Sequence, residues 1–423
     1  MAIKKGDFMK TSIRMMLVMA LVVLFAACGS PLDIDENDNE ISKGEDMPAF
    51  ATGLTPKEWS FLIYMDEDNS LDGWGQFNIN QILKTLTSDQ DVNVVALDDH
   101  YGAPAKLLQI TSNGVVTLPC YPALCAVNSE PDMGNAKTLE DFLSWAVTNF
   151  PANHYVVVVW DHGGGWKSIA VDNTSGSRMM IDALGHAMDA VALQIGRKLD
   201  ITLFDACVMS MIEVADQLKN ASDFMVASES TVGSSGFPYH LMIQRLVANP
   251  GQLPWNFAKG IVDDHVAYYT KKQADAAALD LDPNKIEPLV NAIDSLAIEL
   301  INNMPAWHND IGSARSVAKN TVGGTNGVFW FDDIKLFVDV LASRIGNEIL
   351  DETSAVNTAL ANALYERHTS NLNGKQYGLS INFPANETKY YDKSYLAQNY
   401  AGIGLVFPLE THWDEMLLAY YEY

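Results

Sequence analysis

Positive charge is scarce in this sequence. Of its 423 residues, 27 are Lys or Arg and 53 are Asp or Glu, so the formal net charge is −26. An acidic surface repels the phosphate backbone of nucleic acid, whereas it attracts cations and basic peptides. The composition therefore excludes nucleic acid as a partner and is compatible with protein or peptide substrates.

The first 28 residues have the composition of a targeting signal. Lys10 and Arg14 precede an apolar run over residues 15–27, which is too short to span a membrane comfortably. Small residues then lead to Cys28, a pattern similar to the signal of bacterial lipoproteins, in which that cysteine carries the lipid. We expect lipid anchoring to a bacterial membrane of the cell envelope, with an outer membrane favoured and the protein facing either the periplasm or the cell surface. An ordinary cleaved secretory signal is the alternative.

Cysteine is also rare, with four residues in the chain. Cys28 is assigned to the anchor. Cys120 and Cys125 bracket the short segment CYPALC, which allows either a disulfide or two reduced thiols. Cys207 has no evident partner, and a single thiol in an oxidising compartment requires a functional reason.

Composition divides the rest of the chain into three parts. Residues 29–57 are acidic and polar, with little to bury, and predict a disordered tether. An α/β core is expected over residues 58–250. A mainly helical region with closing strands and a helix is expected over residues 251–423.

Continuous apolar segments without polar alternation predict strands buried on both faces, as in a parallel sheet. Five such segments cover residues 59–65, 92–97, 154–161, 199–206 and 223–230. Between them, residues 139–150 after a capping Thr138, and an apolar stripe from Leu184 to Ile195, predict helices. Nearer the C-terminus, YGLSINFP and GIGLVF predict strands, and THWDEMLLAYY predicts a helix. The fold class is therefore α/β.

Two of the predicted strands end in reactive side chains. VVVVWDHGGGW ends in His162 and three glycines, and LDITLFDAC ends in Cys207. Because the carboxyl ends of parallel strands meet at one edge of a sheet, we expect the imidazole and the thiol to face one crevice. Taken singly, such residues are more often structural. Together they form the pair that nucleophilic catalysis by cysteine requires, since the thiolate is the reactive species.

The residues around this pair favour the same chemistry. A glycine at position 163 lets the backbone approach a substrate, and a free N–H there can point at a developing oxyanion. Cys207 precedes VMSMIEVADQLK, which predicts a helix opened by Cys207. We expect the helix dipole and a nearby imidazolium to lower the pKa of the thiol.

At these residues the sequence resembles the clostripain-like cysteine peptidases, relatives of caspases, gingipains and legumains. The resemblance runs from about Trp59 to the end, and its most specific blocks are the two strand ends just described. It implies a caspase-like αβα sandwich with a mostly parallel central sheet. It also implies an endopeptidase dyad in which Cys207 attacks the scissile carbonyl and His162 protonates the leaving amine. The N–H groups of Gly163 and Cys207 would bind the oxyanion, and no third triad member is implied.

The resemblance also bears on specificity, because family members often cleave after Arg or Lys. Asp205 matches one family position at the base of the S1 pocket, although it could instead cap the next helix. Ser235 stands where a second aspartate is expected, which weakens the prediction of a basic preference. Ser228 and Glu229, at a strand end, are further candidates to line the cleft.

Family members are often made as zymogens and cut between the His and Cys motifs. The interval includes KSIAVDNTSGSRMM, in which Lys167 and Arg178 are the basic residues. We expect self-cleavage after Arg178, or as the weaker candidate after Lys167. An uncut surface loop is the alternative.

A metal site is not expected from the sequence. The triplet DDH occurs at residues 98–100 and 263–265, but adjacent residues rarely converge on one ion. No cofactor is required by the predicted dyad, although the resemblance allows calcium. Three other functions remain open: an inactive homologue that acts as a surface-binding lipoprotein, a thiol transpeptidase or peptidase with a non-basic P1 preference, and a metal-dependent hydrolase.

Overall fold

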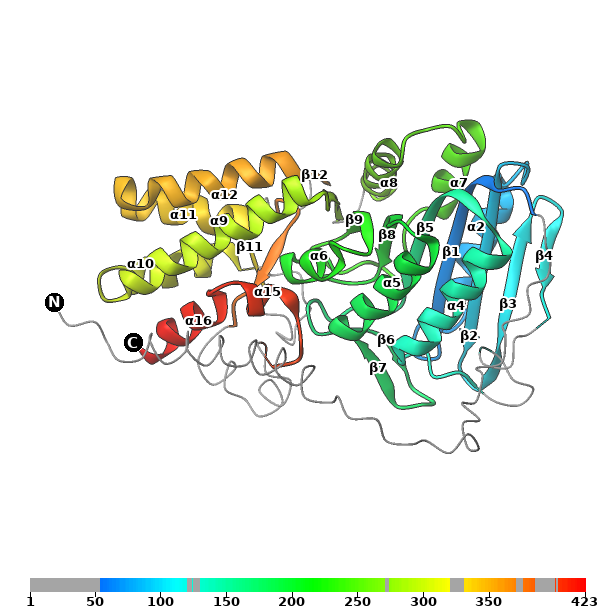
Figure 1. Ribbon diagram of the computed structural model, residues 1–423, viewed down its shortest axis with the longest axis horizontal. Coiled ribbons are helices and arrows are strands. Elements are labelled where there is room, and N and C mark those ends of the chain that lie inside the picture. The colour runs from blue at the N-terminus through cyan, green and yellow to red at the C-terminus, as the bar shows by residue number, and fades with distance from the viewer. Residues whose placement is uncertain are drawn as a thin grey trace, which may run out of the picture. The chain divides into compact units, whose positions relative to one another are not determined.

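A nine-stranded sheet carries the fold, and its five central strands are the five apolar segments that the sequence predicts. The strand order is β12-β10-β9-β8-β5-β1-β2-β3-β4 (Figure 1). The central strands, which pair in parallel, are β1 (Lys57–Glu67), β2 (Val92–His100), β5 (Ala152–Trp160), β8 (Leu199–Asp205) and β9 (Ser222–Ala227). This confirms the predicted α/β class with a parallel central sheet.

The coordinates come from a computed structural model, which describes residues 54–119, 124, 130–270, 274–319, 331–369, 376–384, 400 and 402–423. The predicted anchor at Cys28 and the predicted disulfide between Cys120 and Cys125 lie outside the described residues. No helix in these ranges has the length and apolar character needed to cross a membrane.

The edges of the sheet are antiparallel. On one side β3 (Ala103–Thr111) and β4 (Gly114–Thr117) follow β2 as a meander. On the other side β10 (Asp275–Asp280) and β12 (Leu364–His368) extend the sheet beyond β9. Strands from the region after residue 250 thus complete the same sheet. The predicted division of the folded chain at residue 250 is not tested by this arrangement and stays a prediction.

Helices cover both faces of the sheet, which explains why its central strands are apolar without alternation. Phe61 on β1 packs against Tyr239 of α7 (Tyr239–Ala248), and the α2 (Trp74–Thr85) and α8 (Pro254–Tyr268) helices lie on the same face. Tyr64 points the other way and packs against Phe142 of α4 (Ala136–Asn149), which lies beside α5 (Ile181–Ile195) (Figure 1). Two layers of helices therefore enclose the sheet as an αβα sandwich.

The remaining elements are mainly helical, as predicted. Their bounds are α6 (Ile212–Leu218), α9 (Pro283–Asn302), α10 (Met304–Ala318), α11 (Ile334–Ile345), η1 (Gly346–Ile349), α12 (Leu350–Ala363), α15 (Val406–Glu410) and α16 (Trp413–Glu422). A small sheet pairs β11 (Phe331–Asp333) with β13 (Ser380–Asn382), and a hairpin pairs β6 (Ser168–Asp172) with β7 (Ser177–Met180).

Two local predictions are wrong. GIGLVF is not a strand: residues 402–405 turn, with Gly404 at φ +88°, and the helix α15 follows. A short apolar run has no period of its own that separates strand from helix, so the sequence could not decide this. The α4 helix is capped by Asn135, whose side chain accepts from the Lys137 amide at 3.0 Å, and Thr138 lies within the helix.

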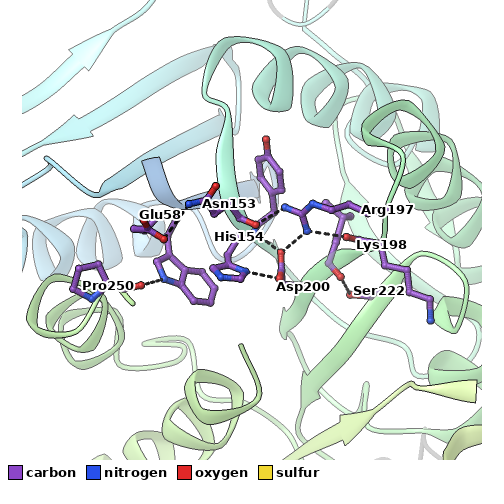
Figure 2. A network of polar contacts seen from close by, with 11 residues as sticks. Glu58, Asn153, His154, Arg197, Lys198, Asp200, Ser222 and Pro250 are labelled. Carbon is purple, nitrogen blue, oxygen red and sulfur yellow. Dashed lines mark hydrogen bonds and ion pairs between the residues drawn. The ribbon is translucent and has the colours of Figure 1, made fainter. Parts of the chain in front are cut away.

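A polar network ties together the strands at the amino edge of the sheet (Figure 2). The buried carboxylate of Asp200 accepts hydrogen bonds from the Tyr155 amide at 2.8 Å and the Arg197 guanidinium at 2.9 Å, and lies 2.7 Å from His154 Nδ1. Arg197 also donates to the carbonyl of Asn153 at 2.7 Å. This edge carries structural contacts, so the opposite, carboxyl edge is free to carry a site.

Candidate active site

His162 and Cys207 lie at the carboxyl ends of β5 and β8, which are neighbouring parallel strands. Both side chains line one cavity of about 120 Å³. The cavity is lined by Leu71, Trp160, Asp161, His162, Asp205, Ala206, Cys207, Val232, Gly233, Ser234 and Gly236. The structure therefore brings the predicted thiol and imidazole to the same crevice, because neighbouring parallel strands end at the same edge of the sheet.

The imidazole of His162 is held by the loop that follows β1. Its Nε2 atom lies 2.9 Å from the hydroxyl of Ser70. Burial lowers the pKa of His162 below its ordinary value, so the neutral imidazole is favoured at neutral pH. The preceding carboxylate, Asp161, turns elsewhere: it accepts from the side chain of Asn69 at 2.7 Å and from the amide of Val171. Asp161 thus fastens loops around the site.

The thiol of Cys207 is half-buried, and its Sγ lies 3.6 Å from the carbonyl oxygen of Val232. Burial raises the pKa of this thiol, and the carboxylates of Asp205 and Asp161 raise it further. The expectation of a lowered thiol pKa is therefore wrong for the free protein. With the pKa of His162 lowered, the resting pair is a neutral thiol beside a neutral imidazole.

Cys207 does not open a helix, contrary to the prediction. The α6 helix begins at Ile212, and the intervening residues form a turn in which Val208 has φ +56°. The amides of Val208 and Ser210 donate to carbonyls of Ser230 and Ser228, at 2.8 and 3.0 Å. These bonds to the segment after β9 compete with helical bonds and delay the helix, so its dipole does not act at the thiol.

The backbone beside the thiol requires a glycine at position 163. A Cβ added there would overlap the carbonyl oxygen of Cys207 and lie 3.0 Å from the Cys207 nitrogen. Within the described residues, the amides of Gly163 and Cys207 donate to no acceptor. Two close backbone donors beside a nucleophile are the groups from which an oxyanion site is built.

Asp205 is another carboxylate that lines the cavity. Its carboxylate accepts from the Phe237 amide at 3.1 Å and from the Tyr239 hydroxyl at 3.0 Å. Burial raises the pKa of Asp205 to about 7. The alternative role as a helix cap does not apply, because α6 begins seven residues later at Ile212. Gly236 at φ +64° lies so close that a Cβ would overlap the carboxylate.

The three other candidate substrate-binding residues do not line the cavity. The Ser235 hydroxyl lies 2.7 Å from the Tyr269 hydroxyl. Ser228 is buried, with its hydroxyl 3.1 Å from Asp275 Oδ1. Glu229 is also buried and accepts from the Gly378 amide at 2.7 Å and the Ser380 hydroxyl at 2.5 Å. Ser228 and Glu229 thus join the end of β9 to β10 and to the segment around β13. Ser235 joins the loop after β9 to the end of α8.

The predicted self-cleavage residues lie on the β6–β7 hairpin. Arg178 is an exposed residue of β7 and pairs with Val171. Lys167, just before β6, is half-buried, and burial lowers its pKa together with the charge of Arg178. The interval predicted as a polar loop is therefore an ordered hairpin with an exposed tip at residues 173–176.

Sequence reasoning missed Asn69 and Ser70, the loop residues that hold Asp161 and His162. The signal was present: the polar run DEDNS directly follows the first buried strand. Since β1 lies beside β5 in the sheet, its carboxyl end meets the end that carries His162. That neighbour relationship is not readable from the sequence, because β1 and β5 are separated by β2, β3 and β4 along the chain.

An αβα sandwich with a thiol and an imidazole at neighbouring strand ends is the arrangement of caspase-like cysteine peptidases. The family model described as the clostripain family, peptidase family C11, matches residues 63–419, and the chain belongs to this family. The family membership predicted from the resemblance is thereby confirmed.

Individual relatives agree with this placement. Clostripain from Hathewaya histolytica is 23% identical over 330 residues, which cover 63% of this chain and 60% of that protein. The chain thus spans less than two thirds of the length of this curated relative. The structure of an inactive zymogen C11 protease from Parabacteroides distasonis has a TM-score of 0.64 at 20% identity, covering 82% of this chain and 98% of the other.

A second solved structure has the same fold. It is a secreted C11 cysteine protease from Bacteroides thetaiotaomicron in complex with an irreversible peptide inhibitor, with a TM-score of 0.62 at 19% identity. The match covers 82% of this chain and 99% of that one. At these identities the likeness of the two structures establishes the fold.

Proposed function

We propose that this protein is a cysteine endopeptidase in which Cys207 is the nucleophile and His162 the general acid and base. The observation that carries the proposal is that both side chains line one cavity beside two backbone amides without acceptors among the described residues. Family membership supports a thiol peptidase, and the intact pair argues against an inactive binding protein.

The resting protonation states suggest how the reaction begins. Because burial favours a neutral thiol and a neutral imidazole, His162 takes the thiol proton as the sulfur attacks the scissile carbonyl. The amides of Gly163 and Cys207 bind the oxyanion. The imidazolium then gives its proton to the leaving amine, and a thioester links the acyl group to Cys207. Water, deprotonated by His162, hydrolyses this thioester and restores the thiol.

The P1 preference is proposed to be Arg or Lys. Asp205 and Asp161 both line the cavity, and Asp205 is proposed as the P1 partner because it matches the family position; a cationic P1 side chain would stabilise its ionised form. Ser235 cannot replace a second carboxylate, and its hydroxyl is engaged with Tyr269. The basic preference therefore depends on Asp205 alone among the proposed S1 residues. The advantage of an Arg or Lys substrate over an uncharged one should be smaller than in a pocket with two carboxylates.

A P1 profile tests the nucleophile and the preference together. The purified protein, Cys207→Ala and Asp205→Asn are incubated with a mixed fluorogenic peptide library. Cleavage after Arg or Lys by the unaltered protein alone supports the proposal, with Asp205→Asn slower by about 30-fold or more on these substrates. Cleavage after other residues would retain the dyad and overturn the basic preference. Equal products from Cys207→Ala would remove Cys207 as nucleophile.

We further propose self-processing after Arg178, with Lys167 as the weaker candidate. Arg178 is exposed, and it lies near the exposed tip of the hairpin between the two motifs. Cleavage would require β7 to leave β6, since substrates bind extended. The test follows the mass of fragments over time in the unaltered protein, in Arg178→Gln and in Cys207→Ala. An active enzyme that stays a single intact chain would exclude self-processing.

Lipid anchoring at Cys28 and a location in the cell envelope are also proposed, on the basis of the N-terminal pattern. Incorporation of labelled fatty acid, compared between the unaltered protein and Cys28→Ser, tests the anchor directly. Label in both proteins or in neither would contradict lipidation of Cys28. Fractionation then locates the labelled protein, and recovery from the cytoplasm would contradict the envelope assignment.

A further inference from the structure

Residues 232–236, here called the rim segment, run from the thiol to the carboxylate of Asp205. At the start of the segment, the carbonyl oxygen of Val232 lies 3.6 Å from Cys207 Sγ. At its end, Gly236 lies so close to Asp205 that a Cβ would overlap the carboxylate. Four of the five residues line the cavity. A P1 side chain that enters the cavity toward Asp205 would therefore lie against the rim segment.

The sequence of the rim segment, VGSSG, gives it little order of its own. Its two glycines have many accessible backbone conformations. Gly233 and Ser234 are exposed, and a Cβ placed on Gly233 would enter open space. The backbone of the segment contributes a turn, in which the Gly236 amide donates to the Gly233 carbonyl at 2.8 Å. The position of this turn in the molecule therefore depends on contacts from other elements.

Asn78 of the α2 helix supplies one of these contacts. Its side chain is completely buried. Nδ2 of Asn78 donates to the Ser235 carbonyl at 3.0 Å, and Oδ1 accepts from Nε1 of Trp160 at 3.0 Å. An indole N–H can only donate and a carbonyl can only accept, so the two partners fix the orientation of the amide. Of the side chains with a similar size, ionised aspartate lacks the donor and leucine lacks both groups, so the site is specific for asparagine.

Trp160 connects this amide to the strand that carries the imidazole. It is the last residue of β5, two positions before His162, and it pairs in register with Asp205 of β8. Trp160 also lines the cavity. Asn78 therefore joins the rim segment to the strand ends from which both His162 and Asp205 extend.

Tyr269, at the C-cap of α8, holds the next peptide group of the rim segment. Its buried hydroxyl donates to the Gly236 carbonyl at 2.6 Å and lies 2.7 Å from the hydroxyl of Ser235. Two helices thus hold two consecutive carbonyls, because α2 binds the carbonyl of Ser235 and the end of α8 binds that of Gly236.

We propose that Asn78 and Tyr269 are positioning residues that determine the specificity for the P1 side chain. Neither is among the described residues that line the cavity, so both act through the rim segment. Their bonds fix the segment against Asp205. Without them the cavity would widen, and a P1 cation would lie farther from Asp205 and closer to water, where the attraction is weaker. The inference rests on the proposed function, in which Asp205 is the partner of a cationic P1 side chain.

The test measures kcat and KM for an Arg substrate and for its uncharged isostere in the full chain. The ratio of the two kcat/KM values does not change with the fraction of folded enzyme, so a merely structural role would not alter it. We expect Asn78→Ala and Tyr269→Phe each to lower the ratio by about 3- to 10-fold, mainly through a higher KM for Arg. The matched controls are Asn80→Ala, an exposed asparagine of the same helix, and Tyr365→Phe, which loses one bond to Asp263. Both controls should keep the parent ratio.

A double-mutant cycle separates this inference from the proposed function. In Asp205→Asn the attraction to Arg has been removed, so Asn78→Ala should no longer change the ratio. An equal fall in both backgrounds, or a parent ratio in both Asn78→Ala and Tyr269→Phe, would overturn the inference and leave the P1 partner in place. A parent enzyme whose ratio does not respond to Asp205→Asn would instead overturn the P1 partner, and the inference with it.

Hydrogen exchange provides the readout for a variant that loses activity. It is measured by mass spectrometry in chains that also carry Cys207→Ala, on peptides that contain Gly236 and Phe237, whose amides are hydrogen-bonded. These amides should exchange at least about 5-fold faster in Asn78→Ala and in Tyr269→Phe, with unchanged exchange in Asn80→Ala. Parent exchange rates in the first two variants would show that the rim segment does not depend on these bonds, which contradicts the proposal.

Discussion

The Nε2 atom of His162 lies 2.9 Å from the hydroxyl of Ser70, which joins the end of β5 to the loop after β1. This contact orients the ring at the edge of the cavity that also contains Cys207. Ser70 is therefore a positioning residue that acts through the imidazole.

We expect Ser70→Ala to lower kcat by about 2- to 10-fold with little change in KM, since one hydrogen bond contributes about 0.5–1.5 kcal/mol. Steady-state kinetics on one Arg substrate measure the effect. Ser313→Ala, on the distant α10 helix, serves as the matched control and should change neither constant. A rise in KM alone would assign Ser70 to substrate binding instead.

Gly163→Ala should abolish most of the activity, because its Cβ would overlap the carbonyl oxygen of Cys207 and displace one of the two backbone segments. A displacement of about 1 Å at reacting groups can cost about 100-fold in rate. Gly251→Ala, where no atom lies within 4 Å of the new Cβ, is the control. If Gly163→Ala retained the kcat of the unaltered enzyme, the close approach of the backbone at Gly163 to the backbone at Cys207 would have no catalytic role.

The preference for Arg should increase with pH. Burial raises the pKa of Asp205 to about 7, so its carboxyl is largely protonated below that pH and ionised above it. Because Arg stays cationic throughout, its attraction to Asp205 grows as pH rises through 7 and levels off above about 8. The ratio of kcat/KM for an Arg substrate to that for an uncharged isostere measures this. The ratio cancels the titration of the dyad.

The control for this profile is Asp205→Asn, which should give a low ratio that is independent of pH. A ratio that is flat in the unaltered enzyme as well would mean that Asp205 does not contact the P1 side chain.

The amino edge of the sheet should affect stability without affecting catalysis. Asp200→Ala removes the acceptor shared by Tyr155 and Arg197 and should lower the free energy of unfolding by about 1–3 kcal/mol. Glu58, in the same network, accepts one hydrogen bond from the side-chain amide of Asn153, and Glu58→Ala should cost about 0.5 kcal/mol or less (Figure 2). Denaturant unfolding and kcat of the folded enzyme test both expectations. A loss of kcat in Asp200→Ala would contradict this expectation, because it would show that the network at the amino edge of the sheet affects the active site at the carboxyl edge.

Much of the site was predictable because strand ends follow a simple rule. The runs before His162 and Cys207 are apolar enough to predict buried parallel strands, and parallel strands place their carboxyl ends at one edge. The start of α6 was not predictable. It depends on bonds from Val208 and Ser210 to the segment after β9, which is distant in sequence from the predicted helix start.

The sequence by itself determined the α/β class, the two strand ends that carry the thiol and the imidazole, and the glycine at position 163 that follows the imidazole. These depend on local patterns of apolar residues and on one general rule of sheet geometry. The tertiary structure alone decided that β1 lies between β2 and β5, which brings Ser70 to His162. It also decided the protonation states, since burial sets the pKa values of Cys207 and His162, and burial depends on residues far apart in the chain.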